Sequence, residues 1–444
     1  MGLAELLMIV ILVGLALYVV LGGADFGAAI WQVLAGSGPR AERIREHAHH
    51  SMAPVWETNH VWLIFVLTML WTTFPVAFGS IASTLCVPLF LAGIGIIMRG
   101  AAYALRAGTS SERQVTTIDM ISAISSVLTP FFLGAAVGGV ASGRVPVGNA
   151  EGDLITSWMN TTSLILGVLS VVTAAYMAAV FLAADAVRRE EHDLAEDYRR
   201  RALIAGALGG VAAVAGLIAL RADTRPLFDE LLGGSGLPAV IASVVAGIAT
   251  VLLLLTHRHE LARYTSAVAV AAIIACWALA QNPTILPGLT IDQAAAPQST
   301  LVAVMIAVVV GGFVLLPSLG LLFTLTLGGR LGEGAHEPAN PQGEYEGLAV
   351  SATDRTGKLA LAALTVGGAF LVIGEVFWMH AVGVLGLTAA ILLGVQAVLP
   401  TLLITPIEPE SEAGGGGGVG PNPPVQAAGW AITLYALWNA VRRR

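Results

Sequence analysis

The uncharged stretch TNHVWLIFVLTMLWTTFPVAFGSIASTLCVPLFLAGIGIIM, residues 58–98, decides the fold. Apart from His60 it carries no side chain that is charged near neutral pH. Since about 20 apolar helical residues cross a bilayer core, the stretch is long enough for two crossings. Phe74-Pro75 interrupts it, and proline is a strong helix breaker. The stretch therefore holds most of a second and a third membrane span.

The whole chain shares this apolar character. Of its 444 residues, 56 % are hydrophobic and 11 % are charged, less than half the usual charge content of a soluble domain. This composition excludes a water-soluble globule. The net charge of −7 leaves no basic face for a nucleic-acid backbone, so no nucleic-acid partner is expected. Cys86 and Cys276 lie inside apolar runs without a CxxC pattern, which predicts neither a disulfide framework nor a zinc site.

Further stretches without acidic or basic residues predict the other spans. A first span covers residues 6–24 and continues past Asp25. The fourth to ninth spans are predicted at 120–143, 154–184, 202–220, 236–256, 264–282 and 299–327, and two more at 359–378 and 381–405. Residues 406–426, rich in Pro, Gly and Glu, predict a disordered linker, and 427–444 a short terminal helix at the membrane interface.

The arginines set the orientation, because loops on the cytoplasmic side carry the basic excess. They follow the odd-numbered spans, at Arg40, Arg43, Arg45, Arg106, Arg113, Arg188, Arg189, Arg199, Arg200, Arg201, Arg258 and Arg263. The intervening loops are acidic or nearly uncharged. The pattern predicts an amino terminus outside the membrane. No basic stretch precedes the first apolar run, which predicts a retained helix rather than a cleaved signal.

Four charged residues lie at the ends of predicted spans. Asp25 comes late in the first span, Glu57 begins the second, Arg99 closes the third and Asp119 opens the fourth, so all four fall at the cytoplasmic level. Ionisable groups inside spans cost several kcal/mol and usually mark function. Such a cluster of carboxylates can carry protons. Simpler interpretations stay open: Glu57 can complement a helix dipole, and Arg99 with Asp119 can be interfacial residues or a structural ion pair.

The sequence predicts no metal site. Glu57 and His60 form one Glu-x-x-His pair, whereas a di-iron bundle needs a second copy and further glutamates. Other intramembrane candidates, Glu375 and His380, lie far along the chain, and too few histidines lie in spans to bind several haems. A further histidine group, His47, His49 and His50, falls in the first cytoplasmic loop, where we expect solvated side chains.

Tryptophans surround the second span, at Trp56, Trp62 and Trp71. They can line a quinone or lipid pocket, or they can anchor the helix at the membrane interface, which is the commoner role of such residues.

Several motifs occur in a characteristic order. They are YVVLGGADFG at 18–27, PVWETNHVWL at 54–63, Phe74-Pro75, Met98-Arg99-Gly100, Asp119 shortly before Ile124-Ser-Ser, and Trp158-Met-Asn160. In order and spacing together, these motifs resemble subunit II of the cytochrome bd quinol oxidases, from about residue 5 to residue 327.

The resemblance implies an all-α polytopic membrane fold. It implies two four-helix bundles, 1–143 and 154–283, and a peripheral ninth helix, 299–327, beside a haem-bearing subunit I. It also implies that this chain binds no haem itself, that haems b and d belong to the partner, and that the complex lies in the bacterial cytoplasmic membrane. The chain would then support assembly of the haem site, bind a quinone, contact lipid and provide a cytoplasmic route for protons.

Individual residues carry these implied roles. Asp25, Trp56 and Arg99 match family positions linked to quinone contact or haem assembly, and Asp25 and Asp119 match positions of a proton relay. Glu57 would join the relay, but the family usually places Asp after the tryptophan, so the carboxylate reaches one methylene further.

Residues 328–444 have no counterpart in the family pattern. The segment 328–405 would add two spans to the fold. One hypothesis is that these helices fill a groove that a separate small single-span subunit occupies in relatives.

The sequence thus favours a non-haem subunit of a quinol:oxygen oxidoreductase that reduces oxygen to water. The alternative is a proton-coupled secondary transporter, although no pair of broken hydrophobic segments repeats in two halves of the chain. A third possibility is a scaffold that has lost its enzymatic partner.

Overall fold

The computed structural model describes residues 2–52, 56–106, 112–327 and 355–373, with short stretches between 379 and 393; next to the gaps, including all of 314–327, only the backbone of the helices is described. Residues 1–335 form one compact unit and residues 336–444 another. The predicted linker at 406–426 and terminal helix at 427–444 lie outside the described residues, as does most of the span predicted at 381–405.

The first half of the larger unit begins with a long apolar rod. It consists of α1 (Leu3–Leu17), a π-helical turn η1 (Tyr18–Gly22) and α2 (Gly23–Val33). The short helix α3 (Pro39–Met52) follows, and then α4 (Trp56–Thr73), α5 (Pro75–Thr84), α6 (Cys86–Arg106) and α7 (Glu112–Ala141). Phe74, where the sequence predicts a break, separates α4 from α5, and Pro75 begins the new helix.

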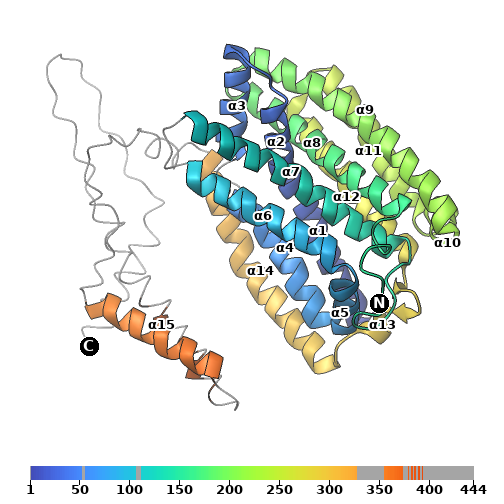
Figure 1. The fold of residues 1–444 in the computed structure, drawn as a ribbon, viewed down its shortest axis with the longest axis vertical. Helices are drawn as coiled ribbons and strands as arrows, with labels where there is room; N and C mark the ends of the chain where they lie inside the picture. The colour runs from blue at the N-terminus through green and yellow to red at the C-terminus, as the bar shows by residue number, and fades with distance from the viewer. Residues whose placement is uncertain are drawn as a thin grey trace. The chain divides into compact units, whose positions relative to one another are not determined.

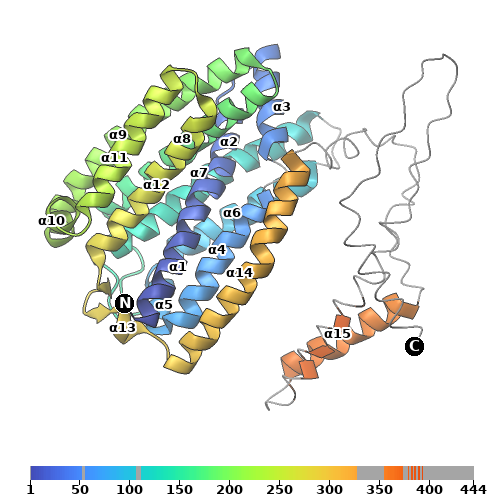
Figure 2. The same cartoon turned by 180° about the vertical axis from the view of Figure 1, so that it is seen from behind.

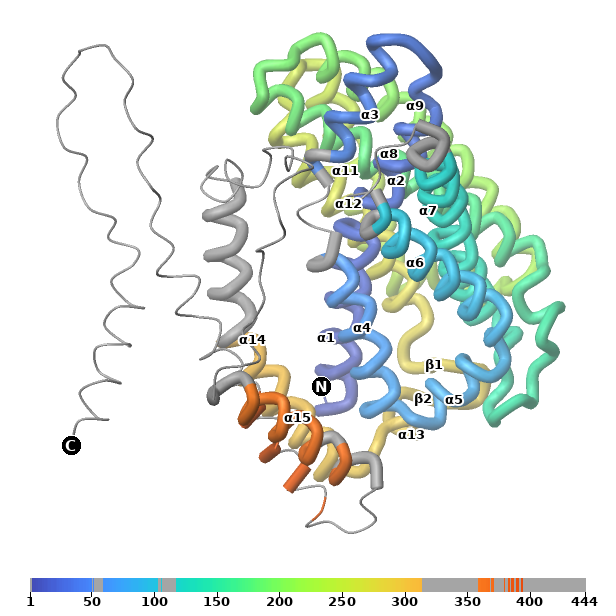
Figure 3. Tube along the Cα trace, turned by 60° about the vertical axis from the view of Figure 1, so that its left-hand side comes forward, coloured from blue at the N-terminus to red at the C-terminus, as the bar shows by residue number. Residues whose placement is uncertain are grey.

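The second half repeats the pattern of long antiparallel helices. These are α8 (Thr161–Arg188), α9 (His192–Asp223), α11 (Leu237–Leu255) and α12 (His259–Gln281), with the short α10 (Arg225–Gly233) between α9 and α11. A small antiparallel hairpin of β1 (Thr284–Leu286) and β2 (Leu289–Thr290) leads to α13 (Ile291–Ala294) and α14 (Gln298–Leu327). Figure 3 shows the hairpin beside α5 and α13.

The predicted all-α polytopic fold is confirmed. Among the described residues, six helices are long and apolar enough to cross a membrane, and the pair α5 and α6, bent by 84°, makes a seventh. Each span predicted within residues 1–327 overlaps a helix, but the third is divided between α5 and α6, and the helix of the span predicted at 154–184 begins only at Thr161. The arginine-rich turns gather at the end of the unit that carries α3, and α5, α10 and α13 lie at the opposite end (Figures 1 and 2). We call these the α3 end and the α5 end.

Helices from the two halves pack along a shared seam of α2, α7 and α8. Glycines allow the backbones to touch there: a Cβ on Gly138 of α7 would lie 2.4 Å from the Cα of Ser163, and one on Gly167 of α8 would lie 2.9 Å from the Phe131 carbonyl oxygen. Close packing of this kind is what small residues permit in membrane helices. The division into bundles at 1–143 and 154–283 stays a prediction.

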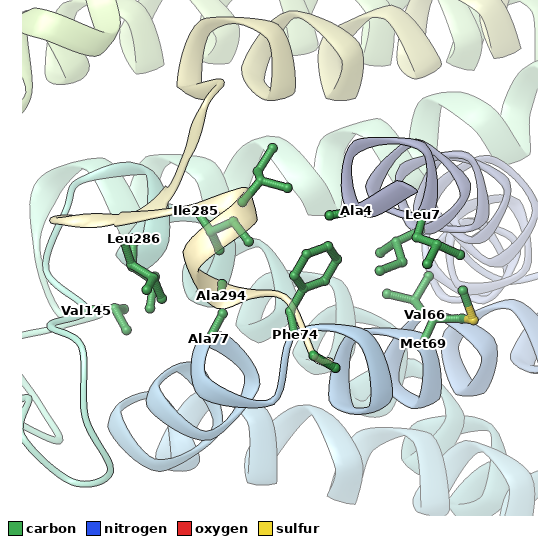
Figure 4. Packing of buried hydrophobic residues seen from close by; sticks show 14 of the residues in the cluster. Ala4, Leu7, Val66, Met69, Phe74, Ala77, Val145, Ile285, Leu286 and Ala294 are labelled. Atoms are coloured by element: carbon green, nitrogen blue, oxygen red, sulfur yellow. The ribbon is translucent and has the colours of Figure 1, made fainter. Parts of the chain in front are cut away.

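An apolar cluster holds the α5 end together (Figure 4). Leu7 of α1 packs near Val66 and Met69 of α4, and Phe74 lies at the break before α5 with no exposed surface. Leu286 of the hairpin joins the same cluster. The cluster thus binds the start of the long rod, which carries Asp25 further along in α2, to the end of α4, which carries Glu57 at its start.

The smaller unit contains α15 (Arg355–Ile373), which coincides with the span predicted at 359–378. A Cβ on Gly386 would lie 2.7 Å from the Cα of Gly367 and 3.3 Å from the carbonyl oxygen of Ala363. Gly386 therefore lies at backbone distance from α15, a close approach that the glycine at 367 permits.

Candidate functional site

The site begins at the π-helical turn η1 inside the first span. This wide turn leaves the Leu21 carbonyl oxygen able to accept a hydrogen bond of 3.1 Å from the Asn59 side chain of α4, which is buried. π-Turns inside α-helices are uncommon and often mark functional positions. Here the turn ties α4 to the first span one turn before Asp25.

The start of α2 faces two neighbours. A Cβ on Gly27 would lie 1.9 Å from the Ala174 carbonyl oxygen, so this side of α2 touches the backbone of α8. Residues two apart in an α-helix point about 200° away from each other. Asp25 therefore faces the opposite side, toward α6 and α7, and none of its surface is exposed.

Asp25 forms a buried ion pair with Arg99 of α6, whose exposed fraction is 1 %. The Arg99 Nε donates to one carboxylate oxygen at 2.9 Å, and Nη2 donates to the other at 2.7 Å. The same Nη2 donates to the Asp25 carbonyl oxygen at 2.8 Å, and the guanidinium lies 5.4 Å from the centre of the Phe26 ring. Two parallel bonds of this type give a carboxylate–arginine pair both strength and a fixed orientation.

Two serines of α7 also accept hydrogen bonds from Arg99. Its Nη1 donates to Ser126 Oγ at 2.8 Å and to Ser122 Oγ at 3.2 Å. Ser126 donates its own proton to the Ser122 carbonyl oxygen at 2.6 Å, so its hydroxyl oxygen is oriented to accept from Arg99. A Cβ on Gly95, one turn before Arg99, would lie 2.3 Å from Thr129 Oγ1, which shows how closely α6 approaches α7.

We call Asp25, Arg99, Ser122 and Ser126 the charged node. It joins α2, α6 and α7 inside an apolar environment and has no net charge. Burying two charges is costly, and the cost is offset here because every donor and acceptor bond described above is short and directed. Arrangements of this type fix one relative position of the helices that they join.

The structure brings together some of the predicted site residues. Asp25 and Arg99 are in direct contact. Asp119 lies three residues before Ser122 on α7 and is half-buried, so it shares a helix face with the node. The sequence suggested a structural ion pair of Arg99 with Asp119, and the structure shows Arg99 paired with Asp25.

Glu57 and Trp56 are the first two residues of α4, and their side chains lie outside the part of the chain that the structure describes. The helix start agrees with the dipole interpretation of Glu57 as well as with a functional one. One turn further, the His60 ring lies 5.9 Å from the ring of Phe26, which is beside the node. The beginning of α4 therefore lies next to the start of α2.

Within the described residues, no group of three His, Cys, Asp or Glu side chains could hold a metal ion. His60 is half-buried among the rings of Tyr18 and Phe26, at 6.4 and 5.9 Å. Glu375 and His380 lie outside the described residues.

Sequence reasoning missed three parts of this region. The serines that coordinate Arg99 had a signal, since Asp119, Ser122 and Ser126 recur at helical spacing and face one side. Asn59 had none, because its partner is a backbone carbonyl group freed by the π-turn. The expectation of solvated histidines is wrong for His47: residues 39–52 form α3, and this side chain is 5 % exposed because α3 packs on α8 and α9.

Comparisons with known proteins agree with one another. Residues 3–326 match the sequence model of the family described as cytochrome bd terminal oxidase subunit II. A Bacillus subtilis (strain 168) protein assigned provisionally as a cytochrome bd menaquinol oxidase subunit II is 24% identical over 239 residues, which are 52% of this chain and 67% of the relative. The cytochrome bd ubiquinol oxidase subunit 2 of the same organism is 25% identical over 114 residues, 26% of this chain and 33% of the relative. A chain in the structure of bd oxidase from Geobacillus thermodenitrificans has the same fold, with a TM-score of 0.59 at 24% identity over 74% of this chain and 99% of that chain.

Proposed function

Because this chain belongs to the cytochrome bd terminal oxidase subunit II family, we propose that it is the non-haem subunit of a membrane quinol:oxygen oxidoreductase. It stands beside a haem-bearing subunit I, in which electrons from quinol reduce oxygen to water. In this role the chain supports assembly of the partner's haem site and delivers cytoplasmic protons. The family membership favours this function over a proton-coupled transporter, which shares only the buried acids.

The charged node is the observation that carries the assembly role. Its two charges are almost completely buried, and they join the consecutive helices α6 and α7 to α2, with 74 positions between Asp25 and Arg99 in the sequence. Breaking a buried ion pair by removing one partner costs roughly 3–5 kcal/mol, because an uncompensated charge remains. The node therefore holds α2, α6 and α7 in one arrangement, and we propose that the partner subunit assembles on this arrangement.

We assign the members of the cluster different roles. Asp25 orients the Arg99 guanidinium through two hydrogen bonds, and it is also a carboxylate of the proton relay. Asp119, half-buried at the α3 end of α7, and Glu57, at the start of α4, are the other carboxylates of the relay. Trp56 at the same helix start contacts the quinone or the assembling haem site.

The orientation follows from the same proposal. The α3 end carries the arginine-rich turns, so it faces the cytoplasm, and the amino terminus lies outside the bacterial cytoplasmic membrane. Protons consumed in oxygen reduction then enter at the α3 end, close to Glu57 and Asp119. Release of the quinol protons on the opposite side of the membrane then separates charge across the membrane without a proton pump.

Two sets of variants test these roles in the purified complex. Glu57→Gln should slow quinol-driven oxygen consumption and leave haem absorbance intact, and Arg99→Leu should lower haem absorbance. Asp119→Asn separates the two roles: slow turnover with full haem content supports the relay, whereas a loss of haem absorbance supports a role in assembly. Glu42→Gln is the matched control, because Glu42 is an exposed carboxylate of α3. Wild-type turnover in the Glu57 variant would remove this residue from the relay, and full haem content in the Arg99 variant would refute the assembly role.

A further inference from the structure

The helix α3 is docked on α9 by charged side chains at the α3 end. Arg40 donates two hydrogen bonds of 2.7 Å to Asp197, and Arg43 donates bonds of 2.6 and 3.1 Å to Asp193. The hydrogen bonds to Asp197, together with its charge, raise the pKa of Arg40. Both pairs are largely exposed, and exposed pairs contribute little to stability. The contact that can decide the position of α3 must therefore be a buried one.

His47 is that buried contact. Its Nδ1 lies 2.9 Å from Glu191 Oε2, in the turn between α8 and α9. Its Nε2 lies 3.4 Å from the Leu182 carbonyl oxygen and 3.7 Å from Asp185 Oδ2, both on α8. Both nitrogens of a side chain that is 5 % exposed thus face oxygen atoms, two of which belong to carboxylates.

This geometry distinguishes the two charge states of histidine. An imidazolium ion has an N–H on both nitrogens, so it can donate to Glu191 and to the α8 oxygens together. A neutral imidazole has one N–H, so one of its nitrogens would present a lone pair to an oxygen atom. The protonated ring also compensates the charge of the two acids that face it.

The other groups around the His47 ring do not remove this difference between its protonated and neutral forms. Tyr198 of α9 offers its ring, 5.6 Å away, and directs its hydroxyl group to the Ile44 carbonyl oxygen at 3.0 Å. Arg189 pairs with Asp185 at 3.1 Å, and Ser51 of α3 also donates to that carboxylate. Asp185 therefore divides its charge among several donors, whereas Glu191 has its shortest contact with His47.

The position of α3 bears on the relay because of chain connectivity. Helix α3 ends at Met52 and α4 begins at Trp56, so few residues separate the docked helix from Glu57. We propose that His47 is a positioning residue: in its protonated form it clamps α3 onto the α8–α9 turn and so holds the start of α4 for proton uptake. The consequence for turnover rests on the proposed role of Glu57, but the clamp itself does not.

Hydrogen–deuterium exchange of the intact oxidase complex tests the clamp directly. Amides of residues 39–52 are compared at pH 6 and pH 8.5 after correction for intrinsic exchange, since histidines change charge between about pH 5 and 8. In the wild type, protection of α3 should fall several-fold at the higher pH, because a neutral ring has one N–H fewer to donate to the oxygen atoms that face it. In His47→Gln the protection should be low at both pH values. The control His192→Gln, at an exposed histidine that begins α9, should behave as the wild type.

A second variant keeps the test decisive if His47→Gln does not assemble. Glu191→Gln retains the histidine and removes the charge of its nearest carboxylate, so protection of α3 at pH 6 should fall toward that of His47→Gln. Protection of α3 that does not change with pH in the wild type, or a His47 variant that matches it, would overturn the proposal. Normal turnover of Glu57→Gln would refute the proposed relay alone, because exchange in α3 is measured independently of turnover.

Discussion

Replacing Asp25, the negative member of the charged node, should destabilise the complex, and a second change at Arg99 should restore the lost stability. In Asp25→Asn, Arg99 keeps its bonds to Ser122 and Ser126 but loses the counter-charge that two of its hydrogen bonds reach. Because Arg99 is 1 % exposed, water cannot replace that charge, and the expected loss is about 3–5 kcal/mol of unfolding free energy. Ser126→Ala, which removes one hydrogen-bond acceptor from Arg99, should cost only about 1–3 kcal/mol.

The double variant separates stability from function. Replacing a buried ion pair by apolar residues of similar volume is often neutral for stability. Asp25→Leu with Arg99→Met should therefore restore most of the stability that either single change loses, so the cycle should show a coupling of roughly 3 kcal/mol. Unfolding is followed by protein fluorescence and haem absorbance in the same samples of purified complex. Additive single changes, or an Asp25→Asn complex as stable as the wild type, would refute the view that this pair is a coupled buried ion pair.

Three other predictions follow from close contacts, the carboxyl-terminal segment and surface charge. Gly27→Ala should prevent assembly, because its Cβ would lie 1.9 Å from a backbone carbonyl oxygen of α8. The control Gly210→Ala should assemble normally, since nothing lies within 4 Å of its Cβ position. The yield of purified complex compares the two variants. Truncation after Gly329 should weaken the complex during size-exclusion chromatography if residues 328–405 fill the groove of a small single-span subunit, and an intact, active complex would rule out that idea. Hydrogen bonds from backbone N–H groups, chiefly that of Thr156, lower the pKa of Asp153. The turn that Asp153 caps should therefore be stable above the ordinary carboxylate pKa range and should loosen as the pH falls through the lowered pKa. Amide exchange in this turn measures the effect, and Asp153→Asn should abolish its pH dependence.

The positions of the helices could be predicted because hydropathy and proline determine them locally. The uncharged stretch 58–98 divides at Phe74, and Pro75 begins the next helix as its sequence requires. The common level of Asp25 and Arg99 also followed from counting residues along alternating spans, and the two side chains are in fact 2.7 Å apart at their closest. The depth of a residue in the membrane depends on its position along a span, so counting residues along the sequence can predict it.

Rotation of a helix about its axis is harder to predict. Asp25 reaches Arg99 because η1 changes the phase of the first span and Gly27 turns the other side of α2 toward α8. A π-turn has no clear signature in YVVLG, and the sequence suggested Asp119 and not Asp25 as the ion-pair partner of Arg99. The docking of α3 was missed for a similar reason: its histidines look solvated until α8 and α9 supply the acids and the ring that surround His47.

The central claim is that this chain belongs to an active complex with a haem-bearing partner. An absorption spectrum of the complex, purified from membranes through a tag on this chain, tests the claim most directly. We expect haem bands in a stoichiometric amount and oxygen consumption when quinol is added. A colourless preparation that holds this chain folded and without a haem-bearing partner would contradict the account.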